Sequence, residues 1–187
     1  MATVAPYPAT LDDLAKVQGK AELIGGRIVT FMASGDQPAT VAFEIAVSLR
    51  EHAKASGVGK AYSDGVGYAL ASPLSSGRQS FEPDASFWAG PPAPNRMRFL
   101  RGVPVFAVEV RSEHDYGPTP DREYADKRAD YFEAGTLVVW DVDPVAETVT
   151  CYRAADPDVA TVFRRGETAD AEPAVPGWRL SVDAIFG

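Results

Sequence analysis

The segment between Val103 and Val142 constrains the fold most, because two apolar runs flank a helical pattern. Val103–Val110 is almost continuously apolar, as expected of a strand that is covered on both faces. Asp121–Ala134 places Tyr124 and Tyr131 on one side of a helix. Thr136–Val142 is a second apolar run. Strand, helix and strand in this order predict a right-handed βαβ unit in an α/β domain.

Local patterns in the rest of the chain predict further helices and strands. The sequence predicts a short helix from a capping box at Thr10 and Asp13, and a hairpin at Gly25–Gly26. A long helix is predicted over Pro38–Ala55, ended by Gly57. Strands are predicted over residues 59–70 with a bend at Gly65, over Asp84–Trp88, over Glu147–Arg153 as an outer strand, and near Val159–Phe163. Trp178, Leu180, Ile185 and Phe186 are expected to pack back on the domain.

The bulk properties favour one globular domain over residues 1–187, with 45% hydrophobic and 24% charged residues. The sequence has no apolar run of about 18 residues, so we expect no membrane span. The beginning of the chain lacks the pattern of a secretory signal. Cys151 is the single cysteine, which excludes an internal disulfide and a cysteine zinc site. These observations predict a cytoplasmic protein.

The net charge of −8 gives no support to non-specific nucleic-acid binding, which usually relies on a basic surface. The basic residues nevertheless cluster in two places. Three arginines lie in the proline-rich loop and three cations lie along the predicted helix at Asp121–Ala134: Arg96, Arg98, Arg101, Arg122, Lys127 and Arg128. A basic patch on an acidic body is therefore possible.

Two acidic residues mark the ends of predicted strands. Asp84 follows Pro83 at a strand start, and Glu109 lies near the end of the covered strand, 25 residues later. Adjacent strands could bring both carboxylates to one edge of a sheet. Two neighbouring carboxylates repel each other unless a cation neutralises them. Hard oxygen ligands of this kind suit Mg²⁺ or Mn²⁺, which also accept phosphate oxygens.

The order of these motifs resembles the Uma2 family, also known as DUF820. Pro-Asp at 83–84 is followed by Glu-Val-Arg-Ser at 109–112 and then by Lys127, Tyr131 and Gly135 in a K-x-x-x-Y-x-x-x-G pattern. Similarity extends to the early ELIGGRIV segment and to the final PGWRLSVDAIF segment. The Uma2 family consists of restriction-endonuclease-like proteins of the PD-(D/E)xK nuclease superfamily.

The resemblance implies a restriction-endonuclease-like mixed central sheet flanked by helices, and hydrolysis of DNA phosphodiester bonds. It also implies that Asp84, Glu109 and the backbone carbonyl of Val110 bind Mg²⁺ or Mn²⁺. Glu22 matches an acidic position that often completes the metal site. Nucleases of this type commonly cut two strands as dimers, so we expect DNA and a second copy of the chain as partners.

The sequence departs from the superfamily pattern two residues after the second acid, where Arg111 replaces the lysine. Arginine remains protonated and cannot act as a base, although it can clamp a phosphate. The resemblance suggests that Lys127, on the following helix, takes over. Lys127 borders Tyr124 and Tyr131, so desolvation could depress its pKa. We expect it to orient the attacking water or to stabilise the transition state.

Simpler interpretations compete with each of these roles. Asp84 could cap a turn, Glu22 could be an exposed strand-end acid, and Glu109 could form a buried ion pair with a cation and no metal. Arg111 is equally consistent with a phosphate contact and with a salt bridge, and Lys127 alone could be a solvated helix lysine. His52 and His114 have no second histidine at ligand spacing. At the level of function, a catalytically inactive binding or regulatory module and an RNA-cleaving enzyme are the alternatives.

Overall fold

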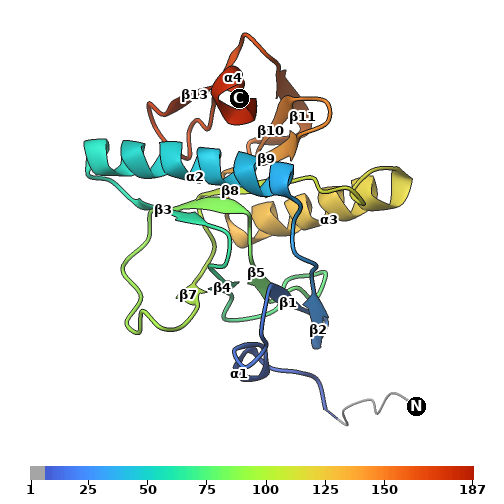
Figure 1. Cartoon of the computed structure of the whole chain (residues 1–187). Helices are drawn as coiled ribbons and strands as arrows, with labels where there is room; N and C mark the ends of the chain where they lie inside the picture. Colours follow the sequence, from blue (N-terminus) through green and yellow to red (C-terminus); the bar gives the residue numbers. More distant parts are fainter. Residues whose placement is uncertain (1–6) are drawn as a thin grey trace.

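A six-stranded mixed sheet forms the centre of the computed structural model, which describes residues 7–187 (Figure 1). The strand order is β11-β10-β9-β8-β6-β3. These strands are β3 (Lys60–Ser63), β6 (Ala85–Trp88), β8 (Phe106–Val110), β9 (Val138–Asp143), β10 (Thr148–Arg153) and β11 (Asp156–Phe163). Only β8 and β9 pair in parallel within this sheet; the other neighbours are antiparallel. The expected mixed sheet is confirmed.

Helix α3 (Pro118–Ala134) connects the two parallel strands, so β8, α3 and β9 form the predicted βαβ unit. The helix begins with a proline in its first turn and ends at Gly135, whose φ of 108° suits a glycine. Alternate residues of β8 face opposite layers. Ala107 packs with Tyr131 of α3, whereas Phe106 and Val108 belong to the core beneath the other long helix.

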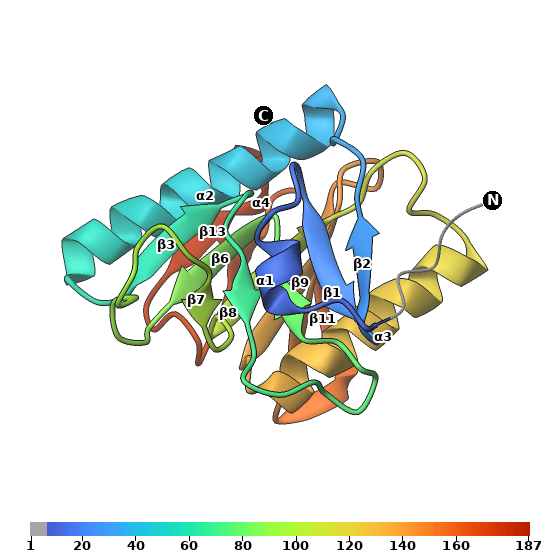
Figure 2. The same cartoon turned by 90° about the horizontal axis from the view of Figure 1, so that it is seen from below.

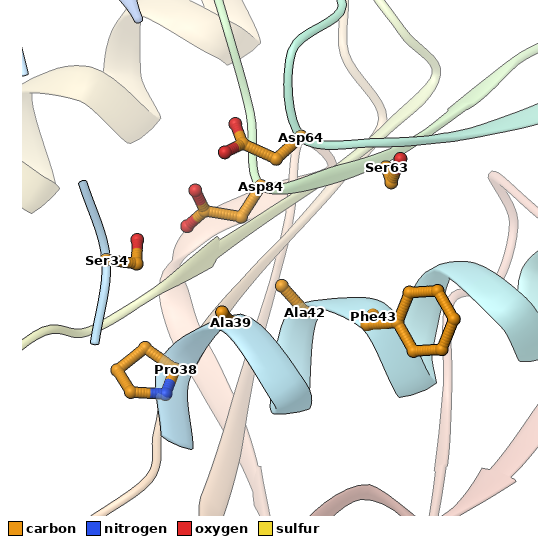
Figure 3. Close-up of a pocket in the computed structure, with 8 residues that line it drawn as sticks. All are labelled: Ser34, Pro38, Ala39, Ala42, Phe43, Ser63, Asp64 and Asp84. Carbon is orange, nitrogen blue, oxygen red and sulfur yellow. The ribbon is translucent and has the colours of Figure 1, made fainter. Parts of the chain in front are cut away.

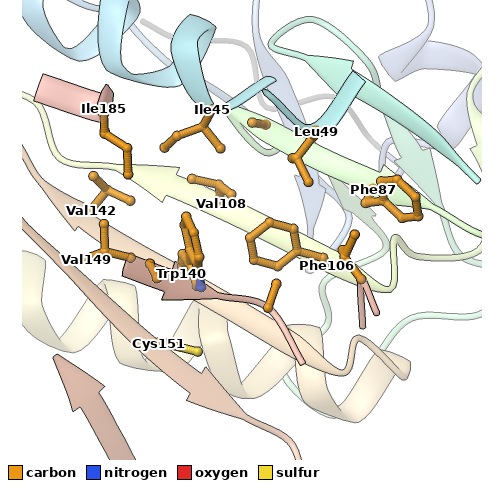
Figure 4. Packing of buried hydrophobic residues seen from close by; sticks show 14 of the residues in the cluster. Ile45, Leu49, Phe87, Phe106, Val108, Trp140, Val142, Val149, Cys151 and Ile185 are labelled. Carbon is orange, nitrogen blue, oxygen red and sulfur yellow. The ribbon is translucent and has the colours of Figure 1, made fainter. Parts of the chain in front are cut away.

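That other helix, α2 (Asp36–Ser56), covers the opposite face of the sheet. Its buried stripe contains Val41, Ile45 and Leu49, the residues that predicted it. Figure 4 shows Ile45 and Leu49 above Val108 and Phe106 of the sheet. Gly57 ends the helix at a φ of 70°, a left-handed conformation that glycine adopts without strain.

The C-terminal segment returns to the same core. It contains the hairpin of β12 (Thr168–Asp170) and β13 (Arg179–Ser181), followed by α4 (Val182–Phe186). The ring of Trp178 lies 5.0 Å from that of Trp140 and 5.6 Å from that of Phe106. Ile185 is buried in this cluster, so the expected packing of the C-terminal segment is confirmed.

Smaller elements lie beside the central sheet. Helix α1 (Leu11–Leu14) precedes a hairpin of β1 (Ala21–Ile24) and β2 (Arg27–Thr30), and a three-stranded sheet contains β5 (Ser80–Phe81), β4 (Tyr68–Ala69) and β7 (Leu100–Arg101) in that order. In the view of Figure 2 the β1–β2 hairpin is seen between helices α2 and α3. The capping box at Thr10 and Asp13 is formed as predicted.

Two sequence predictions are wrong in detail. Residues 59–70 do not form one bent strand, because the chain leaves β3 through Gly65, at a φ of 88°, and β4 joins another sheet. Strand β10 is not the outer strand, because β11 extends over eight residues and pairs with its free edge. Within residues 7–187 no helix is long and apolar enough to cross a membrane.

Candidate active site

Glu109 occupies the penultimate position of β8, and its side chain faces α3. Its Oε1 accepts a hydrogen bond of 2.7 Å from the hydroxyl of Tyr131 and lies 2.8 Å from Nζ of Lys127. The side chain is almost completely buried. Burial raises the pKa of Glu109, while the charge of Lys127 opposes that increase. The carboxylate that ends the apolar strand is thus paired, as buried acids require.

Asp84 immediately precedes β6, whose Ala85 pairs with Val108 of β8. This register places Asp84 beside the end of β8 that carries Glu109. The backbone N–H of Val110 donates to Oδ2 of Asp84 at 2.7 Å. The other carboxylate oxygen, Oδ1, contacts the ammonium of Lys20. Asp84 therefore does more than cap a turn.

The two carboxylates share one electrostatic environment. After burial and the opposing effect of Lys127, the negative charge of Asp84 is the next influence on the pKa of Glu109, which it raises. Lys20 acts in the opposite direction on the same group. Asp84 and Glu109 thus lie together at the common end of β6 and β8, the arrangement that the sequence predicted.

Lys127 of α3 joins Glu109 to Glu22. Its Nζ lies 2.8 Å from Oε1 of Glu109 and 3.1 Å from Oε1 of Glu22. Burial alone would lower the pKa of Lys127, but the charges of Glu109 and Glu22 outweigh burial and raise it. The expectation of a depressed lysine pKa is therefore wrong, because two carboxylates contact the ammonium.

Glu22 of β1 is fully buried and already satisfied by its neighbours. Its Oε1 also accepts a hydrogen bond of 3.0 Å from the backbone N–H of Glu82, and its Oε2 contacts Arg78. Arg78 in turn donates from Nε to Asp130 at 2.7 Å. Burial would raise the pKa of Glu22, but Lys127 and Arg78 hold it below its usual value. Glu22 is therefore not an exposed strand-end acid, because it is buried and contacts two cations.

Arg111 points into a separate group of acids. Its guanidinium binds both oxygens of Asp141 at 2.9 and 2.8 Å, and Nη1 binds Asp121 at 2.6 Å. Of the two interpretations of this arginine, the structure contains the salt bridge. The bidentate contact with Asp141 of β9 and the single contact with Asp121 of α3 together hold the start of α3 against β9. Lys127 is the cation in contact with Glu109.

A hollow in the surface gives access to Asp84 (Figure 3). Asp64 and Asp84 extend from neighbouring chain segments on one side, and the ring of Phe43 lies at the far end. The remaining lining comes from Ser34, Pro38, Ala39, Ala42 and Ser63. Asp64 and Asp84 are therefore reachable from solvent on the side of α2.

Comparison with known proteins identifies the family. A sequence model of Uma2, described as "putative restriction endonuclease", matches residues 8–183. The chain belongs to the Uma2 family. The fold is similar to the crystal structure of a putative nuclease belonging to DUF820 from Anabaena variabilis ATCC 29413, with a TM-score of 0.73 at 20% sequence identity, covering 96% of this chain and 98% of the other. No curated protein matches the chain.

The donor chemistry of this Uma2 site suits a hard divalent ion. Within residues 7–187, no group of three or more acidic, histidine or cysteine side chains is arranged to hold a metal. Mg²⁺, however, is commonly held by one or two carboxylates and several waters. Asp84 and Glu109 supply two carboxylates. The positive charges in contact with them are at present the ammoniums of Lys20 and Lys127.

Several members of this cluster were not predicted from the sequence. Lys20 follows Gly19 just before β1, Arg78 lies in a loop, and Asp130 lies on α3 as one of several acids. Each pairs with a residue more than 50 positions away. The sequence offers one weak signal for Lys20, which is its position as a cation just before the buried strand that contains ELI.

Proposed function

We propose that this Uma2 protein is a metal-dependent DNA endonuclease that uses Mg²⁺ or Mn²⁺. The observation that carries the proposal is the pairing of Asp84 and Glu109 at the common end of β6 and β8, with the ammonium of Lys127 on Glu109. Family membership and the nuclease-like fold support it. Hydrolysis of a phosphodiester requires positive charge where charge develops on the phosphate.

The carboxylates of Asp84 and Glu109, with the backbone carbonyl of Val110, would hold the metal ion. When bound, such an ion acts as a Lewis acid and lowers the pKa of a coordinated water. Glu22 and Glu109 both contact the ammonium of Lys127 and together hold it in place. We therefore assign Glu22 to positioning, and not to metal coordination.

Lys127 contributes positive charge and hydrogen-bond donors. Its contacts with Glu109 and Glu22 favour the ammonium form, so we assign Lys127 no role as a general base. It is suited to orienting the attacking water or to stabilising the phosphate charge. Arg111 supports the site indirectly, since its contacts with Asp141 and Asp121 hold α3 against the sheet.

Nicking of supercoiled plasmid in Mg²⁺ or Mn²⁺ tests the proposal. We expect Asp84→Asn and Glu109→Gln to lower the cleavage rate by roughly a hundredfold or more, because metal-borne charge stabilisation is worth several kcal/mol. Asp158→Asn and Glu44→Gln change exposed acids elsewhere and serve as matched controls. Cleavage that persists in EDTA or in both site variants would contradict the proposal.

The second candidate is a nuclease-fold module without catalysis. It is favoured by one observation: Asp84 and Glu109 each already contact a lysine, so the acidic pair is neutralised without a metal ion. The same preparation should be assayed on duplex DNA, single-stranded DNA and RNA. Binding without cleavage of any of them would favour the module, and cleavage of RNA alone would redirect the substrate assignment.

We further propose that the enzyme acts as a homodimer, because cutting both strands of a duplex is simplest with two active sites. Sedimentation equilibrium with and without DNA measures the assembly. We expect the mass of two chains, at least when DNA is bound. A mass of one chain under both conditions would rule out the dimer while leaving the active-site assignment unaffected.

A further inference from the structure

Lys20 occupies an unusual place for a residue outside the family motifs. Its ammonium contacts Oδ1 of Asp84 and lies 3.2 Å from Oδ1 of Asp64. It comes from the chain directly before β1, whereas the two aspartates follow or precede strands of the central sheet. The lysine side chain is 19% exposed, and Asp84 is 11% exposed, so this pair is shielded from water.

The position of Lys20 matters because Asp84 has few other partners. Its second oxygen accepts from the N–H of Val110, and the acceptor oxygen next to Lys20 is the one that remains for another cation. A divalent ion on Asp84 would stand beside this ammonium, and two positive charges at contact distance repel each other. Lys20 and the ion therefore cannot both keep full contact with Asp84.

The second partner of Lys20 offers an alternative place for the ammonium. Asp64 is 53% exposed, so its carboxylate is well hydrated and can take the lysine at little desolvation cost. Figure 3 shows the carboxylates of Asp64 and Asp84 side by side, both directed into the same hollow. Because Lys20 already contacts both carboxylates, its ammonium can give up Asp84 and still keep Asp64 as a partner.

We propose that Lys20 is an internal competitor of the metal ion: its ammonium neutralises Asp84 in the metal-free protein, and it gives up Asp84 and keeps Asp64 when the ion binds. This inference rests on the proposed metal site and adds a residue that sets its affinity. It explains how an acidic pair can be stably formed before metal binding, since a buried carboxylate without a partner is costly.

Titration calorimetry with Mn²⁺ tests the proposal without any nuclease assay. We expect Lys20→Met to bind Mn²⁺ about tenfold more tightly than the unchanged protein, because one contacting positive charge is removed from the carboxylate. Lys20→Arg keeps the charge and should bind as the unchanged protein does. Lys16→Met removes an exposed lysine four residues earlier and controls for net charge.

Thermal unfolding supplies the second measurement. In EDTA, Lys20→Met should unfold at a lower temperature than the unchanged protein, because Asp84 loses its cation. Saturating Mn²⁺ should raise its unfolding temperature by more than it raises that of the unchanged protein. Circular dichroism establishes that the variant is folded. Equal or weaker Mn²⁺ binding by folded Lys20→Met would overturn the inference while leaving the metal site intact.

A double-mutant cycle tests this role of Asp64. Asp64→Asn should weaken Mn²⁺ binding when Lys20 is present and have little effect in Lys20→Met, so the two changes should be coupled. Equal effects of Asp64→Asn in both backgrounds would overturn that role. If neither the unchanged protein nor Lys20→Met binds Mn²⁺, the proposed metal-dependent function fails as well.

Discussion

At the scale of single residues, the candidate site is a chain of alternating charges. Lys127 lies between Glu109 and Glu22, and Arg78 lies between Glu22 and Asp130. Each buried charge is neutralised by the next. The loss of one member leaves its neighbours buried and unpaired, which costs more free energy than an intact pair contributes.

Lys127→Met should therefore destabilise the protein strongly. The change keeps the length of the side chain but removes the ammonium that contacts both Glu109 and Glu22. Glu22 keeps its contact with Arg78. We expect the free energy of unfolding in urea to fall by about 3 kcal/mol. Lys54→Met, which breaks an exposed pair with Glu51, is the control. A loss below about 1 kcal/mol would show that the pair is hydrated and weak.

Arg111→Lys would restore the residue type of the superfamily motif. Lysine cannot reproduce the bidentate contact with Asp141, so we expect the free energy of unfolding to fall by about 1–2 kcal/mol and cleavage not to increase. Arg50→Lys on the exposed surface of α2 is the matched control. Faster cleavage by the Arg111→Lys variant would show instead that the lysine at this position takes part in catalysis.

The sequence predicted Asp84, Glu109 and Lys127 because each belongs to a local pattern: an acid at a strand end, or a lysine at fixed spacing from a tyrosine. Lys20 and Arg78 belong to no such pattern. Their partners lie 64 and 56 residues away, so only the folded chain brings them together. For the same reason the pKa of Lys127 was misjudged, since its burial was foreseen and its second carboxylate was not.

At the scale of elements, a helix or strand could be predicted when its own residues form a clear apolar pattern. Helix α2 spans Asp36–Ser56, close to the predicted Pro38–Ala55, because its apolar stripe and Gly57 define both its face and its end. Strand β11 is mostly exposed and lacks an apolar pattern, so its full length was not predicted. The separation of β3 from β4 depends on sheet pairing, which residues 59–70 do not encode locally.

Strand β10 carries Cys151 into the core. Burial raises the pKa of this thiol to about 11, from 9. Because the folded state retains the proton, the stability that the thiol contributes is fully present below pH 9 and is lost as the pH rises toward 11.

We therefore expect the advantage of the unchanged protein over Cys151→Ala in urea unfolding to shrink across that pH range. Near pH 8, where an ordinary thiol is partly ionised, Ellman's reagent should modify the native chain slowly and the urea-unfolded chain rapidly. Rapid modification of the native chain would show that β10 opens readily and that the cysteine is accessible.

At the scale of the whole molecule, the net negative charge opposes the proposed binding of DNA. A net charge of −8 repels phosphates, and the local cations of the site are already paired with carboxylates. Association should therefore depend on a divalent ion that reverses the local charge, and not on a general basic surface. Such a dependence would distinguish the protein from binders that rely on counterion release alone.

Fluorescence anisotropy with a short labelled duplex measures this dependence. We expect DNA affinity to rise about tenfold or more when Ca²⁺ replaces EDTA at constant ionic strength, because an added positive charge near the phosphate contributes on this scale. Asp84→Asn should lose most of that increase, whereas Asp158→Asn should retain it. Equal affinity in Ca²⁺ and EDTA would mean that DNA contacts the protein elsewhere.

The contact between Trp140 and Trp178 has a practical consequence. One indole belongs to the central sheet and the other to the C-terminal segment, and their rings lie 5.0 Å apart in a dry environment. Two indoles held in one fixed orientation in an asymmetric environment contribute to the near-ultraviolet circular dichroism. A change in that signal would therefore report whether the C-terminal segment is seated against the central sheet.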